Sequence, residues 1–161
     1  PISAIIGKKD LMDAAQDSFI SSTYWTERVG YTAAIAVLEK MERLGVPGHL
    51  IAYGKQLEQG WLRIAKKHDL RVHVSGIPPL VHLHFDSEKK AEMHTLYAEQ
   101  MLQRGYLLGS AVYTTYAYSE PLIEKFLEDT DAVFGYIKER ELKGDLHPQH
   151  GVISAGFKRL N

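Results

Sequence analysis

The sequence predicts an α+β fold in which helices cover one face of a small mixed or antiparallel sheet. Two long segments with apolar residues at helical spacing, 27–44 and 49–68, come before the sheet. Two short alternating segments follow, separated by a Gly-Ile-Pro-Pro turn, and the rest of the chain alternates between helical and extended patterns. The predicted order of helix, helix, strand, strand, helix, strand, helix is typical of helices layered on a sheet.

The first 45 residues are predicted to contain one strand and two helices. Residues 2–6 are apolar and are expected to form a short strand that ends at Gly7. Residues 8–15 can form a short helix, and residues 27–44 a long one. Gly45 followed by Pro47 is a common signal for the end of a helix.

The middle of the chain is predicted to hold a helix, a hairpin and a second helix. Residues 49–68 carry an apolar helical face, and residues 71–75 and 80–85 alternate as strands on either side of the turn at 76–79. His82 and His84 share one face of the second strand with Leu80. Asp86 or Ser87 is expected to cap the next helix, which runs to about residue 103.

The last third is predicted to add a strand, a hydroxyl-rich segment and a helix. Residues 106–108 read as a short strand, and residues 110–118 as a loop or strand. Ser119 is expected to cap a helix with Pro121 in its first turn, and helical periodicity is lost from about Leu142. We therefore expect three regions: 1–45, ending in a connecting helix; 46–140, a small domain; and 141–161, a tail without assignment.

Composition narrows the class of protein. The chain has 161 residues, 45% of them hydrophobic and 24% charged, a formal net charge of −1 and no cysteine. Such a balance gives no electrostatic basis for binding nucleic acid or an anionic membrane, and we expect neither partner. The lack of cysteine excludes disulfides and fits the cytoplasm. The chain opens on Pro1 rather than methionine, so we expect it to be a fragment of a longer protein.

Ser21, Ser22 and Thr23 stand before the long predicted helix and could bind a phosphate. Backbone N–H groups at a helix start are unpaired, and the helix dipole makes that end positive. A plain N-cap is the alternative interpretation, since serine and threonine are preferred there.

Three segments give the chain a resemblance to the C-terminal part of a class III pyridoxal-phosphate (PLP) aminotransferase of fold type I, close to the glutamate-1-semialdehyde aminomutases. They are the opening segment 1–12, the Ser-Ser-Thr turn with the helix after it, and the segment 104–124 with its Arg-Gly-Tyr-Leu-Leu-Gly-Ser-Ala run. Their order and spacing together carry the resemblance, which extends to about Ile137.

The resemblance implies that Thr23, assisted by Ser22, binds the phosphate of PLP in the neighbouring subunit of a homodimer. It places the Schiff-base lysine before Pro1, outside this chain. Lys8 and Lys9 lie in a polar turn and do not suit that role, because a nucleophilic lysine needs desolvation or a neighbouring cation. The whole protein would pass an amino group from a small-molecule donor to a carbonyl acceptor.

Tyr113 stands where the resemblance to the aminomutases would place a glutamate. With Thr114 and Thr115 it would suit a polyhydroxylated or sugar-like substrate, and the alternative is an aromatic strand end. Arg28 could pair with a substrate carboxylate, with Glu27, or with a subunit surface. We therefore take Tyr113, Thr114 and Arg28 as candidates for the wall of the substrate channel.

Two other functions remain open at the level of sequence. A non-catalytic α+β module for dimerisation or partner binding would also fit a chain without a catalytic lysine. His82 and His84 have the spacing of a metal-chelating pair on a strand, but no third ligand stands at a telling distance, so we expect no metal site.

Overall fold

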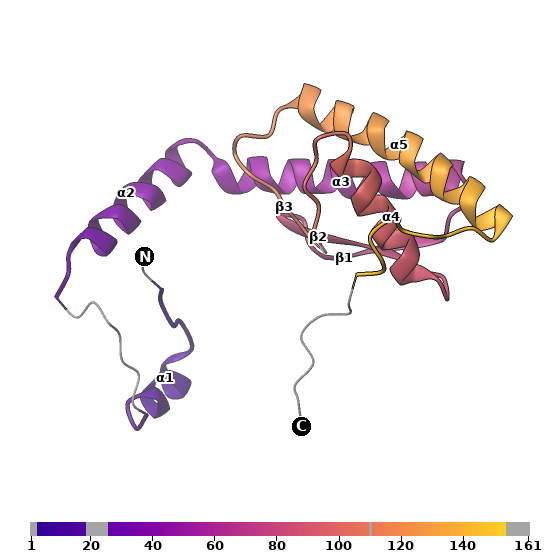
Figure 1. Ribbon diagram of the computed structural model, residues 1–161. Coiled ribbons are helices and arrows are strands. Elements are labelled where there is room, and N and C mark those ends of the chain that lie inside the picture. The colour runs from indigo at the N-terminus through magenta and orange to yellow at the C-terminus, as the bar shows by residue number, and fades with distance from the viewer. Residues whose placement is uncertain (1–2, 19–25, 110, 154–161) are drawn as a thin grey trace. The chain divides into compact units, whose positions relative to one another are not determined.

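The computed structural model describes residues 3–18, 26–109 and 111–153, and the chain divides into two compact units (Figure 1). Unit 1 is Pro1–Val46 and unit 2 is Pro47–Asn161. Helices α1 (Lys9–Ala15) and α2 (Val29–Arg43) belong to unit 1.

The predicted strand at residues 2–6 is wrong for the described residues 3–6, which are extended chain without a strand partner. A strand needs a neighbour for its backbone N–H and C=O groups, and no described segment lies alongside this one. Ile6 is 90% exposed, so no described residue buries this apolar side chain.

Helix α2 begins two residues later than predicted because Glu27 caps it from outside. One carboxylate oxygen of Glu27 accepts from the N–H of Val29 at 2.6 Å, and the other from the N–H of Gly30 at 3.2 Å. Gly45 adopts a left-handed φ of 59° after the last turn, which ends the helix as predicted.

Helix α3 (Val46–Lys67) begins three residues before the predicted start. Pro47 lies in its first turn, where the missing N–H of proline costs nothing because that group has no helical partner. Proline at this point thus helps to begin the following helix.

The sheet of unit 2 has three antiparallel strands in the order β1-β2-β3. Strands β1 (Val72–Ile77) and β2 (Leu80–Phe85) pair along their whole length, with Ile77 opposite Leu80, so the turn is Pro78 and Pro79 alone. Strand β3 (Val112–Tyr113) pairs with the start of β2. The register confirms the predicted alternation in β2: Val81, Leu83 and Phe85 are buried.

Helix α4 (Lys90–Leu102) follows the hairpin, but the strand predicted at residues 106–108 is absent. The backbone N–H of Tyr106 donates to the carbonyl of Met101 at 3.0 Å, which closes the end of α4. The Tyr106 hydroxyl donates to Asp129 at 2.9 Å, and its ring packs edge-on against Phe126. Side-chain contacts to α5 (Glu120–Lys143) therefore hold this segment, in place of the backbone hydrogen bonds expected for a strand.

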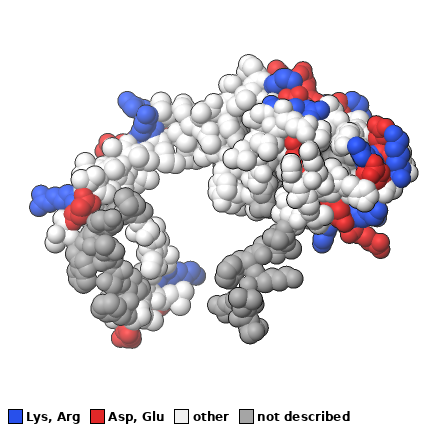
Figure 2. All heavy atoms as spheres, in the orientation of Figure 1, with Lys and Arg blue, Asp and Glu red and all other residues white. Residues whose placement is uncertain are grey.

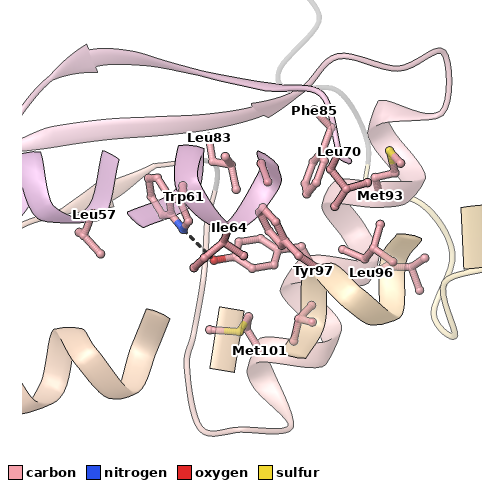
Figure 3. Packing of buried hydrophobic residues seen from close by; sticks show 14 of the residues in the cluster. Leu57, Trp61, Ile64, Leu70, Leu83, Phe85, Met93, Leu96, Tyr97 and Met101 are labelled. Atoms are coloured by element: carbon pink, nitrogen blue, oxygen red, sulfur yellow. Dashed lines mark hydrogen bonds between the residues drawn. The ribbon is translucent and has the colours of Figure 1, made fainter. Parts of the chain in front are cut away.

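Helices α3, α4 and α5 cover one face of the sheet, as predicted, and the core lies between these layers (Figures 1 and 3). Trp61, Val133, Phe134, Ile137 and Met101 are among its most deeply buried side chains. The indole N–H of Trp61 donates to the hydroxyl of Tyr97 at 3.1 Å, drawn as a dashed line in Figure 3.

The hydroxyl of Tyr97 also bonds to Thr130 at 3.1 Å, and burial raises the pKa of this phenol far above its usual range. This polar trio is satisfied inside the core, where an unpaired group would cost stability.

The tail after α5 folds back onto unit 2. Helix α5 ends at Gly144, and Leu146 is buried in the core. The carboxylate of Glu99 in α4 then accepts two consecutive backbone N–H groups, from Gln149 and His150, each at 3.0 Å. We call residues 145–153 the strap; its last described contact is Ile153 N–H to the Thr95 hydroxyl at 3.0 Å.

Charged side chains of both signs lie next to one another on the face of unit 2 shown in Figure 2. Lys67 with Asp131 and Lys125 with Asp129 are examples of such ion pairs. Within the described ranges, no helix is both long and apolar enough to cross a membrane.

Candidate functional site

The residues predicted to carry function fall in separate parts of the chain. Ser22 and Thr23 lie outside the described residues. Arg28 occupies the N-cap position of α2 in unit 1, with an exposed side chain. Tyr113 and Thr114 are adjacent in unit 2, so the structure brings these two together.

The start of α2 already binds a negative charge. Its N–H groups at Val29 and Gly30 donate to the carboxylate of Glu27, as described above. A phosphate held by this part of the chain would therefore depend on residues before Glu27 and not on those two N–H groups.

The segment 113–118, which we call the hydroxyl loop, is fixed to two other elements by Thr114. The backbone N–H of Thr114 donates to the carbonyl of Pro79 at 3.0 Å. Its hydroxyl donates to the carbonyl of Leu50 in α3 at 3.2 Å, and the residue is only 7% exposed. Thr114 thus has a clear anchoring contact, and its predicted role in a substrate channel stays a prediction.

Tyr113 points away from the core. It pairs with Leu80 in the register of β2 and β3, so its side chain stands on the uncovered face of the sheet, and it is 68% exposed. The hydroxyl of Tyr118 donates to the Tyr113 carbonyl at 3.2 Å, which closes the loop on itself, and burial raises the pKa of the Tyr118 phenol.

Sequence reasoning missed His49, which packs against the hydroxyl loop. The imidazole of His49 lies 4.7 Å from the ring of Tyr116 and 4.5 Å from the ring of Tyr53, measured between centroids. His49 and Tyr53 are four positions apart, so they lie on one face of α3. This spacing is visible in the sequence and could have identified the pair. Their contact with Tyr116 requires the tertiary fold.

The hairpin turn rests directly on the backbone of α3 at Gly54. A Cβ atom on Gly54 would lie 1.6 Å from the carbonyl oxygen of Pro78, so any larger residue there would displace the turn. This close approach also fixes Pro79, whose carbonyl holds Thr114. Helix α3, the hairpin turn and the hydroxyl loop therefore form one connected site.

The histidines of the hairpin form a stack on the same uncovered face. His73 and His84 pair across the strands with ring centroids 4.6 Å apart, and His82 lies 6.1 Å from His84. His73 bonds to Asp86 at 2.7 Å and His84 to the Ser75 hydroxyl at 2.8 Å. In the described part of the chain, no three acidic or histidine side chains are placed to hold a metal ion.

Two solved structures share this fold, one of a protein with PLP and one of a transaminase. The FumI protein of Sphingopyxis, solved in its PLP internal aldimine form, matches 90% of this chain with a TM-score of 0.72 and 22% identity. An omega-transaminase from Sphaerobacter thermophilus matches 55% of the chain with a TM-score of 0.51 and 17% identity. These matches cover 35% and 24% of the two proteins.

The similar sequences are aminotransferases. A 2'-deamino-2'-hydroxyneamine transaminase from Streptomyces kanamyceticus is 29% identical over 78% of the chain, and an aminopentol aminotransferase from Sphingopyxis macrogoltabida is 25% identical over 85%. The chain spans about a third of the length of these curated relatives. No family model matches the sequence.

The predicted relationship to a portion of an aminotransferase and the predicted α+β fold are therefore confirmed. The predicted cofactor is the one present in the FumI structure. The site residues and the three predicted regions of the chain are not tested by these likenesses and stay predictions.

Proposed function

We propose that the chain is the C-terminal portion of a class III, fold type I aminotransferase that uses PLP. The observation that carries this proposal is the match of 90% of the chain to the PLP protein FumI, supported by two aminotransferases among the similar sequences. In this proposal residues 1–45 end the cofactor-binding domain, residues 46–140 form the small domain, and residues 141–161 are a tail.

The contribution of the chain to the cofactor would come from Thr23 and Ser22, whose hydroxyls would bind the phosphate. Bound PLP would supply an electron sink for the transfer of an amino group. Glu27 occupies the donors at the start of α2, and the two hydroxyl residues lie outside the described part of the chain. The described residues therefore do not by themselves form a phosphate site, and we derive no step through the cofactor.

The hydroxyl loop would form one wall of the substrate channel. Thr114 anchors the loop by its buried hydroxyl, which leaves the exposed side chains of Tyr113 and Thr115 to donate and accept hydrogen bonds. Arg28 would pair with a carboxylate of a substrate. This set favours a polyhydroxylated or sugar-like acceptor over glutamate-1-semialdehyde, because the tyrosine replaces the glutamate expected in the aminomutases.

A homodimer is part of this proposal, since Thr23 would serve the cofactor of the neighbouring subunit. Helix α2 supports it: Val29, Tyr31, Ile35, Val37 and Leu38 are all exposed large apolar residues. Such side chains on a soluble helix mark a contact surface. The same observation would suit the alternative function, a non-catalytic module that dimerises or binds a partner. We also propose the cytoplasm as its location, on composition alone.

Borohydride trapping tests the function. The longest polypeptide that the gene encodes is incubated with PLP, reduced and mapped by mass. We expect one adduct per chain on a lysine preceding Pro1, and we expect the protein to release an oxo acid from an amino donor when an aldehyde acceptor is present. Adducts scattered over Lys8, Lys9 and other surface lysines would contradict the proposal and leave the binding module.

A further inference from the structure

We propose that His49 is a positioning residue: its ring holds Tyr116 and thereby sets the place of the hydroxyl loop against a hydroxylated substrate. The inference rests on the proposed function, because that function gives the loop its substrate. The contact itself can be tested without any activity.

The loop is anchored at both ends, by Thr114 and by the partly buried ring of Tyr118, which packs against the core. Thr114 bonds through its N–H to Pro79 and through its hydroxyl to Leu50. The next three residues are exposed, and the turn that follows is closed by the N–H of Tyr118 donating to the carbonyl of Thr115 at 3.2 Å. That bond shapes the turn internally and leaves residues 115–117 exposed between the two anchors.

Tyr116 attaches the exposed middle of the loop. Its ring centroid lies 4.7 Å from that of His49 with the planes tilted by 45°. His49 is itself held by Tyr53, one turn further along α3, at 4.5 Å and 60°. Aromatic rings in such tilted and edge-on arrangements attract one another beyond the area they bury. These three residues, the ring cluster, therefore attach the middle of the loop to α3.

The nitrogen of His49 is not what holds the loop. Its Nε2 atom is buried, and no described residue offers it a hydrogen bond. A buried nitrogen without a partner lowers stability, so the contact depends on the shape and faces of the ring. A phenylalanine should therefore preserve the attachment, while an alanine should remove it.

Loss of the ring would free residues 115–117 while Thr114 stays bonded. The exposed hydroxyls of Thr115 and Tyr113 lie on either side of that anchor, so their spacing depends on where Tyr116 lies. A substrate with several hydroxyls needs fixed partners, because each lost hydrogen bond weakens its binding. A substrate without hydroxyls has no such requirement.

Hydrogen exchange tests the attachment in the longest encoded polypeptide with PLP bound. We expect exchange of the Tyr118 amide, whose bond to Thr115 closes the turn around Tyr116, to become about tenfold faster in His49→Ala, as the loss of one aromatic pair would allow. His49→Phe should exchange like the wild type, and His147→Ala, which alters an exposed histidine of the strap, is the control. Unchanged exchange in His49→Ala would overturn the proposal, whatever the activity.

Kinetics then test the link to substrate. With L-alanine as donor, we expect His49→Ala to raise KM for glyceraldehyde about tenfold, the cost of one lost contact, while KM for propanal changes little. His49→Phe should restore the wild-type value, which general damage to the fold would not allow. Equal effects on both aldehydes would overturn the positioning role. A wild type inactive with both aldehydes would count against the proposed function, and exchange alone would then decide the role of His49.

Discussion

Two glycines of α3 differ in whether the fold leaves room for a side chain. Gly54 lies against the carbonyl of Pro78, whereas nothing lies within 4 Å of a Cβ atom placed on Gly48. Both lie within α3, although the helix predicted from the sequence began at residue 49 and included only Gly54. A glycine inside a helix is ordinarily a weak point. The tertiary contact separates them.

Gly54→Ala should destabilise the protein by at least about 2 kcal/mol, because the added methyl group overlaps the hairpin turn and forces it away. Gly48→Ala, the matched control in the same helix, should stabilise it by about 0.5 kcal/mol, since alanine loses less chain entropy. Urea denaturation measures both. Equal effects from the two substitutions would contradict the close packing of the turn on α3.

The candidate site was partly visible at the residue scale. The run of hydroxyls at 113–118 singled out the loop from its composition. Its anchors were not visible, because Thr114 and Leu50 are 64 positions apart and the bond uses a backbone carbonyl that any residue would provide. The sequence suggested Glu27 only as a possible partner for Arg28, whereas its carboxylate is the acceptor that sets the start of α2.

Among the elements, the hairpin was predicted best. Strand β2 has the predicted bounds because its alternation is strict and two prolines precede it. The strands expected at 2–6 and 106–108 failed for one reason: both are short apolar runs, and sequence does not show whether a partner strand lies beside them. In the segment 106–108, Tyr106 is held by a hydrogen bond to Asp129, and a pattern of apolar residues does not predict such a contact.

The histidine stack predicts that the hairpin weakens in mild acid. Burial, followed by His73 and His82, lowers the pKa of His84 from its ordinary value of 6.5, with Lys90 acting in the same direction and Asp86 opposing. Burial, then His84, does the same for His94. The unfolded chain thus takes up protons more readily than the folded one, so stability should fall as pH drops through about 6.5.

His84→Gln should reduce this dependence between about pH 7 and pH 5, the range in which an unfolded histidine gains its proton. Thermal unfolding across the range provides the measurement, with His147→Gln as the control. The paired carboxylates of Asp129 and Asp131, whose pKa values are lowered, should lose their contribution only in stronger acid. Identical slopes for His84→Gln and the wild type would rule out the stack as the cause.

The strap depends on one carboxylate. Glu99→Ala removes the acceptor of two backbone N–H groups and should cost about 1–2 kcal/mol, the usual range for charged hydrogen bonds at a partly exposed site. Hydrogen exchange at Gln149 and His150 should accelerate at the same time. Glu128→Ala, which alters an exposed glutamate on α5, is the control. Protection that persists without Glu99 would show that Leu146 and Ile153 hold the strap without this carboxylate.

For the whole molecule, the two units differ in how their apolar residues are used. All members of the buried hydrophobic cluster belong to unit 2, whereas α2 buries only Gly30 among the described residues. Unit 2 therefore has the means to fold around its own core. The described part of unit 1 leaves large apolar residues of α2 exposed, and the chain spans about a third of the length of its curated relatives.

Ile35→Lys combined with Leu38→Lys should abolish the proposed homodimer. These side chains are 59% and 65% exposed and lie three positions apart on α2, so they share a face. Two charges in an apolar contact would be costly to bury. Sedimentation should show the mass of the longest encoded polypeptide halved, while Glu39→Lys on the same helix leaves it intact. An unchanged mass for the double variant would place the subunit contact elsewhere.

The path of the strap also determines where the polypeptide can be shortened. A truncation designed from helical periodicity alone would end the chain near residue 140. Arg140, however, pairs with Asp145, and Leu146 is buried in the core. A chain cut there would bare the pocket that Leu146 fills and leave the carboxylate of Glu99 facing solvent. A shortened version of unit 2 should therefore keep the strap at least as far as Ile153, because Gln149, His150 and Ile153 all bond to α4.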